Sequence, residues 1–167
     1  RDRLRSRGLG DVYKRQMTYS VNFANYTIGE DAYQNVREVC RHYGKKALLI
    51  GGEMALKAGK EKLIQALASE IQIVDTVLFG TDCTYARMEE LAEHAKKCGA
   101  DMIFGMGGGK ALDTAKGTAE KAGLPVFTFP TIAATCAATT ALSVVYKEDG
   151  NFDSFYFYDK LVPHSVF

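Results

Sequence analysis

The chain has 167 residues, of which 47% are hydrophobic and 25% charged, and its formal net charge is +1. This length supports one ordinary domain or part of a larger one, and this composition excludes a disordered chain. The charge is uneven, because residues 1–16 contain six basic and two acidic residues and carry +4, which leaves −3 for residues 17–167. A mildly acidic body argues against nucleic acid or an anionic membrane as the main partner.

Residues 1–16 differ in character from the chain that follows them. They have neither the apolar core of a signal peptide nor an apolar helical stripe, and they join Met17 abruptly. We interpret residues 1–16 as a non-native leader and residues 17–167 as a nucleotide-binding α/β domain that is truncated. The four cysteines form no CxxC motif and no metal-type spacing with histidine, which favours a cytoplasmic protein. Cys40 and Cys98 continue apolar helical stripes and are expected to be core thiols.

Between residues 32 and 129 the hydrophobic pattern alternates between helical and strand-like periods. The expected elements are a helix from Ala32 to Tyr43 closed by Gly44, a strand Lys46–Gly51, a helix through Leu56–Leu67, a strand Ile71–Phe79, a helix Met88–Cys98 closed by Gly99, a strand Asp101–Met106, a helix Lys110–Ala122 and a strand Leu124–Phe129. This order predicts a mainly parallel sheet covered by helices on both faces.

The pattern changes after Ala141. Two β-prone runs, Leu142–Tyr146 and Ser154–Tyr158, flank an Asp149-Gly150 turn signal and predict a projecting hairpin. Val162–Phe167 has the pattern of a further strand, and because no closing helix follows it we expect a truncated reading frame.

A stretch of 25 residues, 122–146, carries no charge and is long enough to span a bilayer. It also contains Pro125, Pro130, Gly123 and several hydroxyl side chains. We therefore expect a buried strand, a polar loop and a short helix here, and no membrane partner.

The strongest local signal is the segment from Phe104 to Lys110, which contains three consecutive glycines between a strand and a helix. Glycines there let the backbone approach a ligand closely, and the helix N-terminus offers free N–H donors and partial positive charge. The segment fits neither a Walker A loop nor the full Rossmann fingerprint. Its placement favours a phosphate site over a bare turn.

A second polar segment, residues 131–140, follows the next strand and is rich in Thr and Ala. Ligands of doubly wound sheets bind beyond the carboxyl ends of the strands. We therefore expect this segment and the glycine loop to be neighbours that line one nucleotide groove.

Three segments in this order, Gly107–Lys116, Pro130–Thr135 and Ala141–Tyr146, resemble the glycerol dehydrogenase branch of the iron-containing (group III) alcohol dehydrogenases. The resemblance implies a Rossmann-like parallel sheet domain of the dehydroquinate synthase-like fold with a projecting β-hairpin. It also implies a C-terminal helical metal-binding domain, which is missing from this chain. The implied activity is NAD(P)-dependent, metal-assisted oxidation of the CH–OH group of an alcohol or polyol, with this chain as the inactive cofactor-binding half.

The resemblance also carries residue roles. Positions that match the family's NAD or NADP groove are Gly52, Gly107, Gly108, Gly109, Lys110, Asp113, Thr131, Ala134, Thr140, Leu142 and Tyr146. Asp113 is expected to order the glycine loop rather than react. No catalytic residue is expected in this chain, and the family's metal ligands (an Asp and two His, for zinc or iron) are expected beyond Phe167. His164 is expected to be an exposed loop residue, and the full-length protein a homo-oligomer with a small alcohol or aldehyde substrate.

Two positions depart from the family pattern. Cys136 replaces an Asp at the substrate site, which favours less polar alcohols or aldehydes over glycerol. Gly52 replaces the acid that holds the adenosine ribose in NAD-preferring members, so NAD and NADP both stay open. Dehydroquinate synthase, glycerol-1-phosphate dehydrogenase and a stand-alone nucleotide-binding module are the alternative functions.

Overall fold

The computed structural model describes residues 25–158 and 163–167, and the predicted leader at residues 1–16 lies outside them. In chain order, the elements are β1 (Asn25–Tyr26), the 3-10 helix η1 (Ala32–Asn35), α2 (Val36–Cys40), β2 (Lys46–Gly51), α3 (Glu53–Leu67), β3 (Gln72–Leu78), α4 (Tyr85–Lys97), β4 (Met102–Gly107), α5 (Gly109–Ala122), β5 (Val126–Pro130), β6 (Leu142–Tyr146), β7 (Phe152–Phe157) and β8 (Ser165–Val166).

The main sheet has six strands in the order β1-β8-β5-β4-β2-β3, and every strand pair in it is parallel. This confirms the parallel sheet predicted from the alternating pattern. The run predicted at the end of the chain contributes β8, which lies between β5 and β1.

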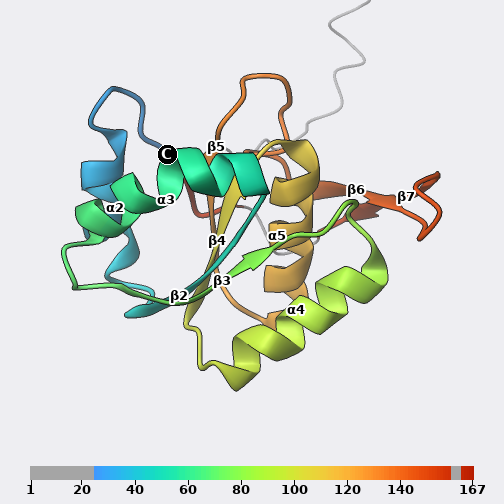
Figure 1. Ribbon diagram of the computed structural model, residues 1–167, viewed down its shortest axis with the longest axis horizontal. Coiled ribbons are helices and arrows are strands. Elements are labelled where there is room, and N and C mark those ends of the chain that lie inside the picture. Colours follow the sequence, from blue (N-terminus) through green and yellow to red (C-terminus); the bar gives the residue numbers. More distant parts are fainter. Residues whose placement is uncertain (1–24, 159–162) are drawn as a thin grey trace, which may run out of the picture.

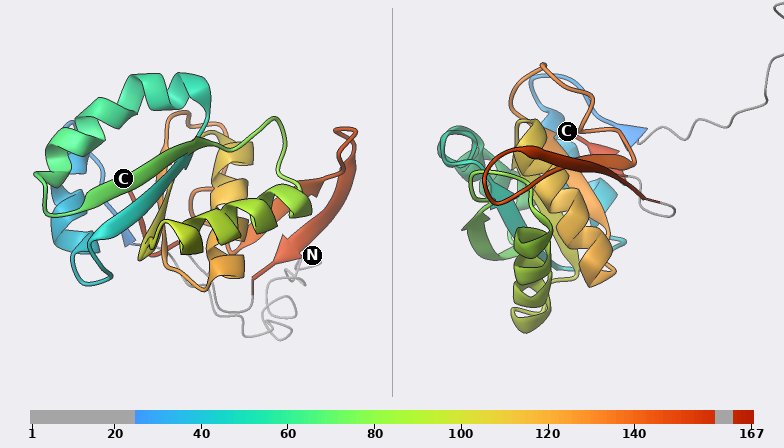
Figure 2. Two further views of the ribbon diagram at one scale, coloured as in Figure 1. Left: turned by 60° about the horizontal axis from the view of Figure 1, so that its bottom comes forward. Right: turned by 90° about the vertical axis from the view of Figure 1, so that its right-hand side faces the viewer.

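Helices cover both faces of the sheet (Figure 1 and Figure 2). Side chains alternate along β2, so that Leu49 packs into the core with α2 and α3, whereas Leu48 and Ile50 pack into the core with α4 and α5. Burial on both faces explains why this strand is a continuous apolar run in the sequence.

Helix α5 packs closely against β4. Its residues from Ala111 to Ala119 are all buried, so the helix is enclosed on every side. A methyl group added at Gly105 of β4 would lie 2.6 Å from Cβ of Ala115. The missing side chain at Gly105 therefore sets how near α5 comes to the sheet.

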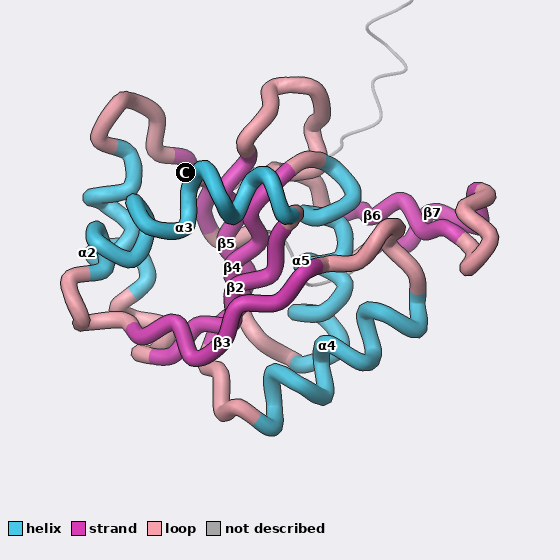
Figure 3. The backbone as a smooth tube through the Cα atoms, viewed as in Figure 1, coloured by secondary structure: helices cyan, strands magenta, loops and turns pink. Residues whose placement is uncertain are grey.

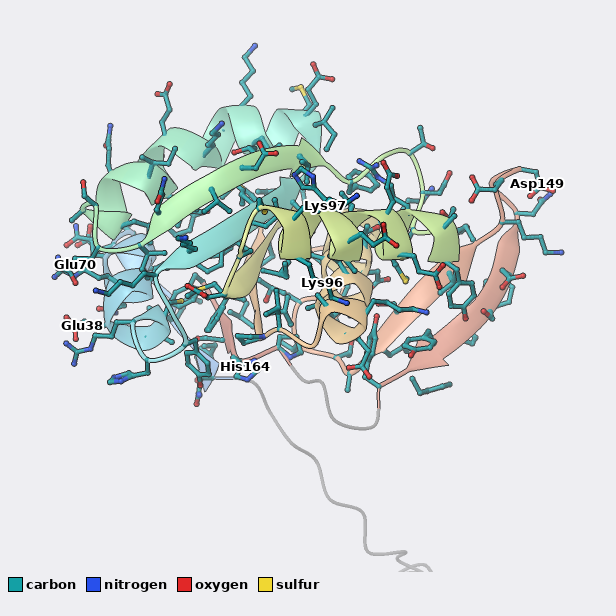
Figure 4. All side chains as sticks on the ribbon, turned by 90° about the horizontal axis from the view of Figure 1, so that it is seen from below. Glu38, Glu70, Lys96, Lys97, Asp149 and His164 are labelled. Carbon is teal, nitrogen blue, oxygen red and sulfur yellow. The ribbon has the colours of Figure 1, made fainter. Side chains whose placement is uncertain are left out.

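Strands β6 and β7 pair antiparallel and form a separate two-stranded sheet (Figure 3). This confirms the predicted hairpin, whose turn carries Asp149 away from the main sheet (Figure 4). Strand β7 begins and ends earlier than predicted. Tyr158 lies beyond β7, is 6% exposed, and donates its hydroxyl to Oγ of Ser143 at 2.6 Å.

The helix predicted from Ala32 to Tyr43 is shorter than expected. It is a 3-10 turn followed by α2, which ends at Cys40. Gly44 does not cap it, because the chain turns at 41–43 first. Gly44 has φ +147°, and an added methyl group would lie 2.2 Å from Cβ of Asp101, whose carboxylate accepts the Lys45 and Lys46 amides at 2.9 and 3.0 Å.

The expectation that His164 is an exposed loop residue is wrong. It precedes β8 and is half-buried, with its ring centroid 4.9 Å from that of Tyr43 and 5.7 Å from that of Phe127 (Figure 4). Burial lowers the pKa of His164. Its amide donates to the Val126 carbonyl at 2.8 Å, which fixes it beside the sheet.

The uncharged stretch 122–146 forms β5, a loop with turns at 137–139, and β6, so the short helix predicted within it is wrong. Across the part of the chain that the structure describes, no helix combines the length and apolar character that crossing a membrane requires.

Candidate functional site

The site is built at the carboxyl ends of three neighbouring strands, β2, β4 and β5. Gly51 aligns with Met106 across β2 and β4, and Gly107 aligns with Pro130 across β4 and β5. The three loops that leave these strands therefore begin at one edge of the sheet. This edge is where parallel α/β sheets bind their ligands.

The glycine loop needs glycine at its first position. Gly107 has φ +147°, and an added methyl group would lie 3.0 Å from Cβ of Ala111 and 3.6 Å from the amide nitrogen of Gly52. A side chain here would also stand between the ends of β2 and β4.

Two helices begin next to this loop. Gly52 is the N-cap of α3 and Gly108 is the N-cap of α5, and neither helix has a side-chain cap. The first N–H groups of both helices are therefore not satisfied by side chains of their own caps. Two helix N-termini with partial positive charge at one edge suit an anionic group such as a pyrophosphate.

Lys110 stands in the first turn of α5 with its side chain 48% exposed. Its ammonium group is paired with Asp82, and it lies 4.8 Å from the centre of the Tyr146 ring. The hydrogen bond to Asp82 raises the pKa of Lys110. Asp82, in the loop after β3, therefore holds the Lys110 ammonium group beside Tyr146 of the hairpin.

Sequence reasoning missed Asp82. Its signal is positional, because Asp82 follows β3, and β3 pairs with β2 at the same end of the sheet. Without the strand order, nothing in the chain connects Asp82 with a lysine 28 residues away.

The segment after β5 lies over the glycine loop, as its order in the sequence predicts. The amide of Thr131 donates to the carbonyl of Gly107 at 3.1 Å. A methyl group at Gly108 would lie 3.0 Å from Cδ1 of Ile132, and one at Gly109 would lie 3.4 Å from Cγ2 of Thr135.

The remaining predicted groove residues lie on this segment and on the hairpin. Ala134 and Cys136 are exposed, whereas Thr140, Leu142 and Tyr146 are half-buried. Thr140 lies two residues before β6, Leu142 begins this strand, and Tyr146 ends it beside Lys110.

Asp113 does not order the glycine loop as expected. It is 6% exposed and lies between α5 and β6, where its Oδ2 accepts the amide of Val144 at 3.1 Å. Its other carboxylate oxygen is 2.8 Å from Nζ of Lys116. Both oxygens are thus engaged away from the glycine loop.

A cavity of about 800 Å³ lies where α3 meets the segment before α2, next to the end of β5. It reaches the predicted groove only at Thr131 and is otherwise lined by residues such as Tyr33, Lys62 and Gln65. Its walls lack the glycine loop, so we do not assign the phosphate site to it.

Among residues 25–158 and 163–167, no three His, Cys, Asp or Glu side chains gather in a cluster that could hold a metal ion.

The chain matches known proteins over most of its length. The sequence model of the iron-containing alcohol dehydrogenase family matches residues 24–167. A glycolaldehyde reductase of Halobacterium salinarum is 32% identical over 82% of this chain and 38% of its own length, and a glycerol dehydrogenase of Pseudomonas putida is 35% identical over 78% of this chain and 36% of its own.

A comparison with solved structures finds the same family of enzymes. The crystal structure of glycerol dehydrogenase from Schizosaccharomyces pombe superimposes with a TM-score of 0.77 at 27% identity, over 90% of this chain and 38% of that one. The chain therefore belongs to the iron-containing alcohol dehydrogenase family, an oxidoreductase family, and is similar to its glycerol dehydrogenases. It spans less than half the length of the relatives that it matches.

Proposed function

We propose that this chain is the cofactor-binding half of an NAD(P)- and metal-dependent oxidoreductase that acts on the CH–OH group of an alcohol or polyol. The observation that carries the proposal is the pair of helix N-termini, those of α3 and α5, that open without side-chain caps beside Gly107. A dinucleotide's pyrophosphate fits this cradle because backbone can approach it where a Cβ would obstruct. When bound, NAD(P) accepts or supplies the hydride.

The residues of this chain bind and orient that cofactor in our proposal. Gly107, Gly108 and Gly109 supply backbone at the phosphates, and Lys110 supplies a formal charge. The segment from Thr131 to Ala134 closes the groove over them. The described residues do not fit the family's metal, so we propose that its ligands belong to the part of the relatives' length that this chain does not span.

We propose that the substrate is a small alcohol or aldehyde less polar than glycerol. Cys136 is exposed on the segment that lines the groove, and a thiol hydrogen-bonds a polyol more weakly than a carboxylate does. The similarity to a glycolaldehyde reductase supports an aldehyde as the small carbonyl partner.

The free thiols of the described residues support a cytoplasmic location. Homo-oligomerisation is proposed from the family resemblance alone.

The test is a titration of the 167-residue chain with NADH and with NADPH, followed by the fluorescence of the reduced nicotinamide. We expect saturable binding of at least one dinucleotide, with competition by its oxidised form. Binding of neither, by a chain whose circular dichroism shows it folded, would contradict the proposal.

A carboxylate at Gly52 is expected to favour NADH over NADPH. Gly52 is an N-cap with φ −82° and ψ 149°, and an added methyl group would lie 3.5 Å from Cε1 of Phe79, so a side chain fits. In Gly52→Asp, repulsion of the 2′-phosphate should raise the preference for NADH by about tenfold. The new cap should also stabilise the fold by a few tenths of a kcal/mol, since glycine is already a tolerated N-cap.

The matched control is Gly52→Ser, which caps α3 without adding charge. Both variants should unfold at higher urea concentration than the parent chain, but only the Asp variant should change the ratio of the two dissociation constants. If the ratio of the NADH and NADPH dissociation constants is unchanged in Gly52→Asp, the adenosine ribose does not bind beside residue 52.

Removal of the Asp82 carboxylate is expected to tighten dinucleotide binding. Asp82 holds Lys110 and would stand as a negative charge near the bound phosphates. In Asp82→Asn we expect the dissociation constant for NADH to fall by about threefold at low salt, with the gain shrinking as salt is added. Asp149→Asn, the same change at the hairpin turn, is the control (Figure 4). Weaker binding in Asp82→Asn would mean that Asp82 positions Lys110 rather than competing for it.

A further inference from the structure

One charged side chain lies in the interior of the domain without any role in the proposed phosphate contacts. Lys116, two turns into α5, is 0% exposed and is among the largest fully buried side chains. Lysine is almost never fully buried unless its ammonium group is paired, because desolvating that charge is costly. Burial lowers the pKa of Lys116, and the neighbouring Asp113 opposes this shift. The partners of the ammonium group should therefore explain its position.

Those partners come from one short segment and from Asp113. The Nζ atom of Lys116 donates to the carbonyl oxygen of Thr140 at 3.1 Å and to its hydroxyl at 3.4 Å, and it also donates to the carbonyl oxygen of Leu142. It lies 2.8 Å from Oδ1 of Asp113, three residues earlier on the same helix. Lys116 thus ties α5 to the residues that begin the hairpin.

Asp113 extends the same attachment along β6. Its Oδ2 accepts the amide of Val144 at 3.1 Å, and its main-chain carbonyl accepts the hydroxyl of Ser143 at 3.0 Å. Asp113 and Lys116 therefore bind the segment 140–144 between them. Within the described residues the hairpin forms a separate sheet and shares no strand pairing with the main sheet. Further hydrogen bonds between the hairpin and the rest of the domain include the amide of Tyr146 to the carbonyl of Cys83 at 2.8 Å and Tyr85 to Ser154 at 3.0 Å.

Helix α5 connects this attachment with the phosphate site. Its first turn carries Gly109 and Lys110, and the next two turns carry Asp113 and Lys116. An enclosed helix is a rigid spacer, so whatever Lys116 fixes is held at a set distance from the glycine loop. The residues that it fixes include Thr140 and Leu142, two of the proposed groove residues.

We propose that Lys116 is a positioning residue of the cofactor groove: its buried ammonium group holds Thr140 and Leu142 against α5, so that the hairpin wall and the glycine loop form one preorganised site. This inference rests on the proposed function. Preorganisation lowers the ordering cost of binding, and Lys116 therefore acts on affinity without touching the dinucleotide.

The test compares Lys116→Met with the parent 167-residue chain by hydrogen exchange and by ligand titration. Met keeps most of the side-chain volume and removes the charge. We expect amides in 140–157 to exchange roughly tenfold faster, whereas β2 and β4 keep their protection. NADH affinity should fall by roughly tenfold and ADP affinity by less than about threefold, because ADP lacks the nicotinamide nucleoside, the part that this inference assigns to the wall formed by Thr140 and Leu142.

Lys121→Met is the matched control, since Lys121 lies on the same helix but forms a surface pair with Glu89 at 2.9 Å. Lys121→Met should change neither the hydrogen exchange of the hairpin amides nor the affinity for NADH and ADP. If Lys116→Met yields little folded chain, Ser143→Ala removes a smaller part of the same attachment, and the same ordering of effects is expected at reduced size.

Five outcomes would overturn the inference. Unchanged exchange in 140–157 would show that Lys116 does not hold the hairpin. Equal losses of NADH and ADP affinity, or faster exchange throughout β2 and β4, would show a general structural role. If the parent chain binds neither ligand, the proposed function fails and this inference fails with it, whereas parent binding that Lys116→Met leaves intact refutes this inference alone.

Discussion

Replacement of Gly109 by aspartate is expected to abolish dinucleotide binding. Gly109 is the first residue of α5, and a methyl group there would lie 3.4 Å from Cγ2 of Thr135, so a side chain can be accommodated with a small shift. The carboxylate would accept the free N–H groups at the helix start and repel the phosphates. We expect the dissociation constant for NADH to rise by at least about 100-fold.

Gly109→Asn separates charge from size, because it has nearly the same shape and no net charge. It should lose much less affinity than Gly109→Asp. An acid near a helix N-terminus is stabilising, so Gly109→Asp should not lower the thermal unfolding midpoint. If Gly109→Asp still binds NADH as tightly as the parent chain, the glycine loop does not bind the phosphates.

Gly105→Ala is expected to cause a large loss of stability. The added methyl group would lie 2.6 Å from Cβ of Ala115, an atom fixed to the backbone of α5, so relief requires the helix to move from the sheet. Overpacking of this kind costs about 3 kcal/mol. Urea denaturation should show this loss as a lower midpoint with an unchanged slope.

Gly99→Ala is the comparison for this variant. Gly99 has φ +67° and an added methyl group would meet nothing within 4 Å, so only the backbone conformation is penalised, by about 1 kcal/mol. If Gly105→Ala is no less stable than Gly99→Ala, the close contact of α5 with β4 does not constrain the fold.

The central strands β2, β4 and β5 could be predicted from the sequence because they are buried on both faces. Lys46–Gly51 was predicted with the bounds that β2 has, since an apolar run between two helical patterns has little alternative. The glycine loop could be placed for the same reason, as it links a buried strand with a helix.

The roles of Asp113 and Lys116 could not be predicted. Both lie on α5, whose amphipathic pattern gives no sign that the hairpin covers the helix face that carries these charges. Their hairpin partners are 24 to 31 residues away and lie on β6 or just before it. A long-range contact of this kind depends on where the hairpin packs, which local periodicity does not encode.

His164 was wrongly predicted for a related reason. A histidine between a proline and a short strand is usually exposed, but here the rings of Tyr43 and Phe127 come from two distant segments and enclose it. Neither segment is near His164 in the sequence.

The most direct test of the account is a map of amide chemical shifts in the isotope-labelled chain as NADH or NADPH is added. We expect the largest changes at Gly52, at 107–110 and at 131–135. Changes confined to the cavity beside Tyr33, Lys62 and Gln65, with the glycine amides unmoved, would contradict it.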